Sequence, residues 1–287
     1  STWNLGDDVQ TLAAINMLAK YGIHDYIVLD REHLNTYTSV GEVVLIMNGW
    51  YQHNLNGFPP PPNIKPILLS FHTSNRAFIQ QHHAWFKHHE PIGCRDQSTV
   101  ELFQQVNIKA YFTGCLTLTF DTVPKSQKYP NLVVVVDANR KVGKPTNADH
   151  FLRNYQNATF FSHGISTHPG LTRTGFKKRE EVAKGFLDIY AYASLVITSR
   201  LHVALPARAL GTDVLFAHRF YQTDPRFEGL QHVIHGGMEY HLSRRSIDPK
   251  IINTIRASVS KVFHQLVMPY LTPQQLEMHN NTSSQGY

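Results

Sequence analysis

The chain has 287 residues, 42% hydrophobic and 17% charged, with a formal net charge of +6. This composition is ordinary for a soluble globular protein, and the length allows two compact domains or one large one. No apolar run approaches the roughly 20 residues that span a bilayer, and no signal-peptide pattern opens the chain. The basic residues are scattered, so the charge favours an anionic ligand or a membrane surface over nucleic acid.

The first half of the chain alternates apolar-striped segments, which predict helices, with short apolar runs, which predict buried strands. In chain order these are a helix at 8–21, strands at 26–29, 43–47 and 67–71, a helix at 75–88, a strand near 92, a helix from 97 and a strand near 111. Strands alternating with helices are typical of a mostly parallel, doubly wound sheet.

A polar stretch at 121–131, rich in Pro and Lys, is the best candidate for a linker, and the alternation restarts after it. The second half predicts, in order, a strand at 132–137, a helix at 147–156, a strand at 158–161, a helix at 178–193, a strand at 195–198 and a late helix at 251–271. A polar tail follows at 272–287.

Two α/β halves joined by one linker predict two Rossmann-like, doubly wound parallel-sheet domains in a glycosyltransferase-B-like arrangement, with a ligand cleft between them. We expect the N-terminal domain, on the acceptor side, to comprise 1–122 and the C-terminal domain, on the donor side, to comprise 131–250. In this architecture a late helix such as 251–271 often packs back on the first domain.

Arg200 and His202 directly follow a predicted buried strand. The β-branched run from Leu195 to Thr198 forms this strand, and a helical pattern of small and apolar residues follows it and ends near Gly211. Both side chains therefore lie where a strand's carboxyl end meets a helix amino end, the edge at which open α/β sheets bind ligands and anions. An arginine beside an imidazole suits an anionic substrate. The structural alternative is that Arg200 forms an ion pair and His202 caps the helix.

Four stretches resemble, in order, the motifs of the polysaccharide pyruvyl transferase family. The segment just described resembles the family's Arg-Leu-His signature. The other three stretches are Asn4-Leu-Gly-Asp7, Pro91-Ile-Gly-Cys-Arg-Asp96 and Ala110-Tyr-Phe-Thr-Gly-Cys-Leu-Thr-Leu-Thr119. Each motif is short, but the ordered set is fairly specific and spans roughly 4–216. The resemblance implies the same two-domain fold.

The resemblance also implies a reaction: phosphoenolpyruvate is the donor, a sugar with two hydroxyls is the acceptor, and the products are a cyclic pyruvate ketal and phosphate. Arg200, with Arg95 as a partner, would bind the donor's carboxylate and phosphate. His202 would bind the phosphate and act as the acid, and His163, in a loop after a strand, is the predicted base. The other predicted substrate-binding residues are Leu201, Asn4 and Asp7.

Several of these positions have a structural alternative. Asp7 with Gln10 forms a plausible capping box, although Gly6 could instead turn the chain so that Asn4 or Asp7 touches the acceptor. Asp96 could be a helix N-cap with Arg95 as its ion-pair neighbour. Since the chain has 18 histidines, His168 and His53 are further candidates for the base.

Two aromatic or histidine-rich segments have no assigned chemistry. Trp50 and Tyr51 follow an early strand and either stack on a sugar or pack in the core. The pairs His82-His83 and His88-His89 lie on a helix-like stretch with no Cys or carboxylate at ligand spacing. We therefore expect a solvated helix face and no metal.

The sequence thus predicts a polysaccharide pyruvyl transferase with no cofactor beyond phosphoenolpyruvate as co-substrate. Its expected partners are a small-molecule donor and a glycan acceptor that could be lipid-linked, with peripheral membrane association and no nucleic acid. Its two cysteines suit a reducing cytoplasm. The alternatives are a glycosyltransferase-B-type enzyme with a nucleotide-sugar donor and a non-catalytic glycan-binding protein. The oligomeric state stays open.

Overall fold

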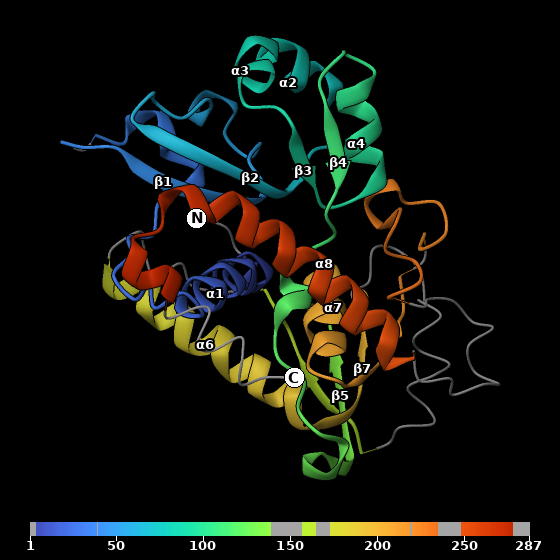
Figure 1. Cartoon of the computed structure of the whole chain (residues 1–287). Coiled ribbons are helices and arrows are strands. Elements are labelled where there is room, and N and C mark those ends of the chain that lie inside the picture. Colours follow the sequence, from blue (N-terminus) through green and yellow to red (C-terminus); the bar gives the residue numbers. More distant parts are fainter. Residues whose placement is uncertain are drawn as a thin grey trace. The chain divides into compact units, whose positions relative to one another are not determined.

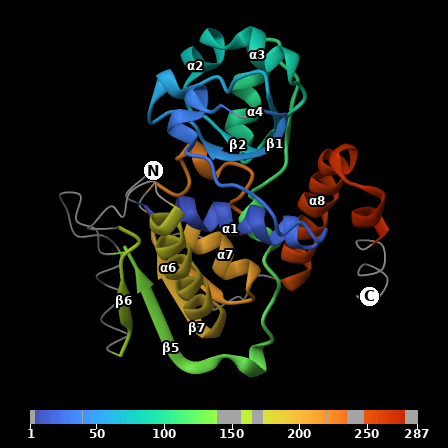
Figure 2. The same cartoon turned by 90° about the vertical axis from the view of Figure 1, so that its left-hand side faces the viewer.

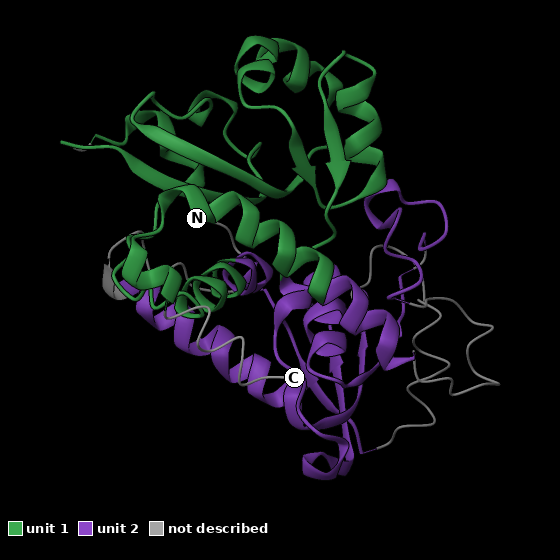
Figure 3. Cartoon of the chain, in the orientation of Figure 1, with its two compact units in different colours: residues 1, 11–116, 257–287 green, residues 2–10, 117–256 purple. Residues whose placement is uncertain are grey.

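The computed structural model describes residues 4–38, 40–138, 157–164, 173–218, 220–234 and 248–277. The chain forms two compact units (Figure 3). The first comprises Thr11–Leu116 and Ala257–Tyr287, and the second comprises Thr2–Gln10 and Thr117–Arg256. Within the described ranges, the helices are all too short or too polar to cross a membrane.

The first unit contains a parallel four-stranded sheet (Figure 1). Its strands are β1 (Val43–Trp50), β2 (Ile64–His72), β3 (Ile92–Cys94) and β4 (Ala110–Phe112), paired in the order β1-β2-β3-β4. The helices α2 (Arg76–Gln81) and α3 (His83–His88) connect β2 to β3, and α4 (Gln97–Gln104) connects β3 to β4. Rings including Phe58, Phe71, Phe86 and Phe103 pack into one buried cluster.

Two predictions for the first unit are wrong. The segment 26–29 is not a strand: Tyr26, Ile27 and Val28 are 37%, 60% and 42% exposed and pair with no other strand. An apolar run forms a strand only where a neighbouring strand pairs with its backbone, and the described sheet ends at β1 without 26–29 joining it. The helix predicted at 75–88 is divided into α2 and α3 at His82, whose backbone leaves the helical region.

The second unit contains the other parallel sheet, in the order β6-β5-β7-β8. Its elements are β5 (Tyr129–Val136), β6 (Thr159–Phe161), α6 (Arg173–Tyr192), β7 (Ala193–Thr198), α7 (Leu201–Ala209) and β8 (Asp213–Phe216). The helices α6 and α7 cover the same face of this sheet (Figure 2). β5 begins inside the predicted linker 121–131, because Tyr129 already pairs with Ala193. The helix predicted at 147–156 lies outside the described residues.

The two sheets differ in winding. In the second sheet, the chain moves from β5 to one side, to β6, and then crosses to the other side of β5, to β7 and β8. This reversal makes the second sheet doubly wound, with a switch point between β5 and β7. The described strands of the first sheet follow one another in chain order, so they contain no such reversal. Two parallel sheets with connecting helices fit a two-domain Rossmann-like α/β fold.

Two of the described helices, α1 and α8, have residues in both units. The helix α1 (Leu5–Ala19) begins earlier than predicted, and its residues up to Gln10 belong to the second unit. The late helix α8 (Pro249–Val267) belongs to the first unit from Ala257 onward. There, Phe263 and His264 lie against the ring of Tyr21. The domain ranges 1–122 and 131–250 stay predictions.

Candidate active site at the strand ends

Three polar segments meet at the carboxyl edge of the second sheet. Asp137 follows β5, Ser162 and His163 follow β6, and Arg200 follows β7. Parallel strands end at the same edge, so residues distant in sequence come together there. The switch point of this sheet lies between β5 and β7, and such points form the ligand-binding crevice of open α/β sheets.

Arg200 is held by two partners at this edge. Its Nε donates to Asp137 Oδ2 at 2.6 Å, and its Nη1 donates to Asn4 Oδ1 at a longer 3.4 Å. Its Nη2 is buried and has no hydrogen-bond partner in the described part of the chain. A buried polar group normally has a partner, so this nitrogen is a candidate donor to an anionic ligand.

The start of α1 lies beside Arg200. Asn4 forms an antiparallel bridge with Gly164, and the Leu5 amide donates to the His163 carbonyl at 3.0 Å. The Asn4 side chain also accepts a capping hydrogen bond from the Gly6 amide at 3.1 Å. Asn4 therefore caps α1 and contacts the candidate anion-binding arginine with the same oxygen.

His202 lies in the first turn of α7 and packs against Gly6. A Cβ added to Gly6 would lie 3.1 Å from His202 Cβ, which is tighter than most real contacts. Gly6 was expected to turn the chain sharply, but it lies within the first turn of α1. Its missing side chain instead makes room for His202. Leu201 is the first residue of α7 and is half-buried.

Asp7 and Asp8 have different surroundings in the first turn of α1. Asp7 Oδ1 accepts a hydrogen bond from Gln10 Nε2 at 3.2 Å, as expected, but the helix begins at Leu5, so Asp7 is not its cap. Asp8 forms a buried bidentate ion pair with Arg179 of α6, with distances of 2.9 and 2.7 Å. This ion pair joins α1 to α6 and was not predicted.

His163 is fully buried rather than exposed in a loop. Its Nε2 shares a hydrogen bond of 2.6 Å with the hydroxyl of Tyr190 on α6. Burial, assisted by the charge of Arg200, lowers the pKa of His163 to about 4, so the imidazole is neutral near neutral pH. Its Nδ1 has no hydrogen-bond partner among the residues described. His168, the next candidate base, lies outside the described residues.

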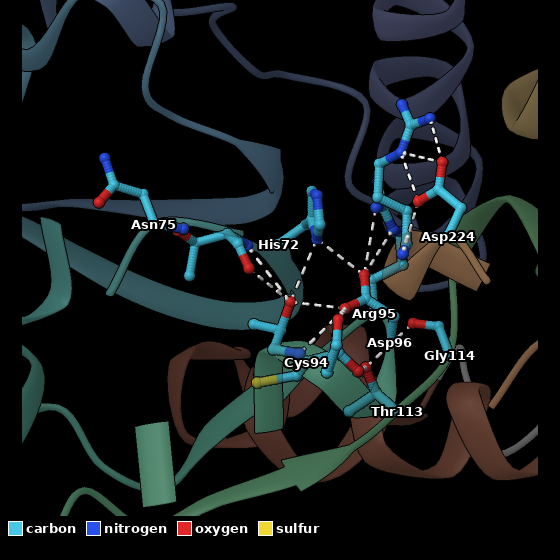
Figure 4. Close-up of polar contacts among 12 residues, drawn as sticks. His72, Asn75, Cys94, Arg95, Asp96, Thr113, Gly114 and Asp224 are labelled. Atoms are coloured by element: carbon cyan, nitrogen blue, oxygen red, sulfur yellow. Dashed lines mark hydrogen bonds and ion pairs between the residues drawn. The ribbon is translucent and has the colours of Figure 1, made fainter. Parts of the chain in front are cut away.

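The carboxyl edge of the first sheet carries a second polar cluster (Figure 4). Arg95 Nη2 lies 3.1 Å from Asp96 Oδ2, and His72 Nδ1 lies 2.7 Å from the same oxygen. The other oxygen of Asp96 accepts from the Thr99 amide at 3.0 Å and so caps α4, as predicted. Burial raises the pKa of Asp96, but the His72 hydrogen bond and the Arg95 charge more than offset this and hold it well below its ordinary value.

Comparison with known proteins now assigns the chain. The family model described as polysaccharide pyruvyl transferase matches residues 4–216. The chain belongs to this family. A search of curated proteins finds no match. The crystal structure of a functionally uncharacterized protein from Klebsiella pneumoniae is similar, with a TM-score of 0.53 and 14% identity over 82% of this chain and 89% of that chain. At this identity the similarity supports the fold alone.

The structure also places the aromatic residues and the histidine pairs of this pyruvyl transferase family member, to which the sequence assigned no chemistry. Tyr51 is buried and stacks on Phe71, with ring centroids 5.7 Å apart, so it belongs to the core. Trp50 is half-buried against His53. The histidine pairs are not simply solvated: His83 Nε2 bonds the Val106 carbonyl. No described group of three His, Cys, Asp or Glu residues could hold a metal ion.

Sequence reasoning missed Asp137, Tyr190 and His72. Asp137 and His72 occupy strand-end positions, the same signal that identified Arg200, so the strand-end rule could have found both. Tyr190 gives no local signal, because it lies inside α6 and meets His163 only through the packing of this helix on the sheet.

Proposed function

We propose that this chain transfers the pyruvyl group of phosphoenolpyruvate to two hydroxyls of a sugar in a surface or capsular glycan, or in a precursor of one. Family membership supports the reaction class. The observation that carries the donor assignment is Arg200, whose buried Nη2 has no partner in the described structure and lies at the switch point of a parallel sheet. A guanidinium with an open edge suits a carboxylate or phosphate.

The proposed roles follow the geometry at the second sheet. Arg200 binds the donor carboxylate, while His202, beside it in the first turn of α7, binds the phosphate and serves as the acid. Asn4 orients Arg200 through its side-chain oxygen. His163 is the proposed base; because Tyr190 occupies Nε2, only Nδ1 can receive the hydroxyl proton.

Three further residues keep their proposed roles in substrate binding. Leu201 and Asp7 are assigned to the site because of their positions in the motifs. Arg95 is proposed as a second cation for the donor, and it would have to exchange Asp96 for the ligand in order to act.

The chemistry balances without a further reactant. The acid protonates the methylene carbon of phosphoenolpyruvate, which makes the central carbon oxocarbenium-like. The first sugar hydroxyl adds to this carbon and gives its proton to the base. The carbon–oxygen bond to phosphate then breaks, and the second hydroxyl closes the ketal. Of the two hydroxyl protons, one restores the proton that the acid gave to the methylene carbon, and the other leaves with phosphate. Positioning and acid–base catalysis are each worth orders of magnitude.

The alternative is a glycosyltransferase-B-type enzyme that uses a nucleotide sugar, because a strand-end cation at a switch point also suits a diphosphate. The glycosyltransferase-B-like arrangement of the two domains is part of the proposal in both cases. We also propose a cytoplasmic location and peripheral association of the basic chain with a membrane surface; both a free and a lipid-linked glycan precursor are compatible with this proposal.

Donor identity can be tested by thermal-shift measurement, because a ligand that binds only the native state raises its apparent stability. We expect phosphoenolpyruvate to stabilise the chain more than a panel of nucleotide sugars does. Incubation with candidate glycans should then release phosphate and add a pyruvyl mass to the sugar. Stabilisation by a nucleotide sugar, together with no response to phosphoenolpyruvate, would reject the proposal in favour of the alternative.

A further inference from the structure

Asp137 occupies the centre of the strand edge at which Arg200 lies. It directly follows β5, the strand from which the second sheet winds in both directions. Its backbone has a positive φ of 50°. Such a conformation is uncommon for a residue other than glycine, although Asp and Asn adopt it more readily than most.

Both oxygens of the Asp137 carboxylate are occupied by groups from the two neighbouring strands. Oδ1 accepts from the Ser162 hydroxyl at 2.7 Å, while Oδ2 accepts from the His163 amide at 3.0 Å and from Arg200 Nε at 2.6 Å. The backbone is tied to the same strands, because its amide donates to the Phe161 carbonyl and its carbonyl accepts from the Ser199 hydroxyl. The carboxylate is therefore fixed in position before any ligand arrives.

This arrangement determines which edge of the Arg200 guanidinium remains open. Asp137 contacts Nε alone, since Nη2 has no partner within the described structure. The fork formed by Nε and Nη2 is thus closed on one side by Asp137. Among the described residues, the fork formed by Nη1 and Nη2 is opposed by the long 3.4 Å contact to Asn4 alone. A planar anion can bind bidentately at that end-on fork.

We propose that Asp137 is a positioning residue that holds Arg200 by Nε so that its end-on Nη1–Nη2 fork binds the anionic donor. This inference rests on the proposed function in one respect, that the ligand of Arg200 is the donor. Burial raises the pKa of Asp137, but its hydrogen bonds and the Arg200 charge more than offset this and keep it ionised.

The test compares Asp137→Asn with Asp137→Gly. Both replacements tolerate a positive φ, so the backbone conformation is preserved. Asn keeps an oxygen that can accept from Arg200 Nε, whereas Gly keeps none. We expect the dissociation constant for phosphoenolpyruvate, measured by calorimetry, to rise about tenfold to a hundredfold in Asp137→Gly and less in Asp137→Asn. The KM for the acceptor should change by less than about twofold.

Asp224→Asn is the matched control, because Asp224 likewise accepts from an arginine Nε, that of Arg226, but in a local pair two residues apart whose arginine is half-exposed. It should leave donor affinity unchanged. A folded Asp137→Gly variant that binds phosphoenolpyruvate as tightly as the wild type would overturn the inference. Equal changes in the KM values for donor and acceptor would also overturn it, because a merely structural role predicts them.

A second readout does not depend on the ligand. The Nε–H signal of Arg200, assigned by its loss in Arg200→Lys, should exchange slowly with solvent in the wild type. It should exchange at least about tenfold faster in Asp137→Gly. If the wild type binds no phosphoenolpyruvate, the proposed function fails while this measurement still decides whether Asp137 holds Arg200; unchanged exchange would reject the inference.

Discussion

The two strand edges place an arginine in equivalent positions and use it differently. At the first sheet, Arg95 is buried against Asp96, which also pairs with His72 and caps α4. At the second sheet, Arg200 is held by Asp137 but keeps a buried nitrogen without a partner in the described residues. In the first cluster, Arg95 is paired with its neighbour Asp96. In the second cluster, Arg200 is held in place by Asp137 and still has a nitrogen to which a ligand could be bound. A cation next to a strand end is therefore ready to bind a ligand when its partners leave an edge open, whereas Arg95 would first have to release Asp96.

The largest expected effect is the loss of stability in Asp96→Ala. This substitution removes the cap of α4 and leaves the buried Arg95 unpaired, which should lower the free energy of unfolding by about 3–5 kcal/mol. Urea unfolding followed by fluorescence is suitable, since Trp50 and Trp85 lie in the first unit. Asp137→Asn should cost less, because the Arg200 side chain is 20% exposed and can be hydrated. Equal costs at both edges would remove the distinction between them.

The roles of the two histidines at the second edge should separate in mutant kinetics. His163→Ala should reduce turnover by roughly 10²–10⁴-fold, the usual worth of one general base, with donor binding nearly intact. His202→Ala should impair both donor binding and turnover. Steady-state kinetics with calorimetric donor affinities measure both quantities. Near-normal turnover in His163→Ala would show that the base is elsewhere.

Acid should destabilise the second edge through His163. Its pKa is about 4 in the folded chain, below the ordinary 6.5, so the unfolded state binds the proton first as the pH falls. Stability is therefore complete above about pH 6.5 and decreases down to about pH 4, by about 3 kcal/mol in total. Unfolding free energies measured across this range should fall less steeply in His163→Gln. Identical slopes would show that other groups, such as His82 and His218, whose pKa values burial also lowers, carry the effect.

The local sequence pattern predicted which residues follow the strands. It did not predict which of these residues pair with one another at the sheet edge. The β-branched run before Arg200 predicted the strand end that carries Arg200 and His202, and the structure places Asn4 beside Arg200. The Asp137–Arg200 pair spans 63 positions and depends on the strand order, which no local pattern reveals. The apolar run at 26–29 failed for the same reason, because a strand requires a partner as well as a suitable sequence.

Arg200→Lys should weaken donor binding while preserving the fold. A lysine ammonium cannot donate to Asp137 and also present a planar fork, so the donor should lose about 1.5–3 kcal/mol of binding free energy, roughly tenfold or more in affinity. Calorimetry with phosphoenolpyruvate measures this loss. Arg226→Lys is the control, because the Arg226 side chain is half-exposed and forms its ion pair with Asp224, two residues away, rather than at a strand end. Unchanged affinity in Arg200→Lys would remove Arg200 from the site.

The smallest effect should come from Gly6→Ala, which tests the packing at the second edge. An alanine in a helix normally stabilises it by about 1 kcal/mol relative to glycine. At Gly6 the new Cβ would lie 3.1 Å from His202 Cβ and 3.2 Å from Asn4 Oδ1, so part of this gain should be lost as these side chains move by a few tenths of an ångström. Turnover should fall a few-fold. Gly185→Ala in α6 is the matched control, because its Cβ would meet nothing within 4 Å. It should raise the melting temperature and leave turnover unchanged. If Gly6→Ala behaved like Gly185→Ala in both measurements, the close packing of His202 and Asn4 around Gly6 would not matter for the reaction.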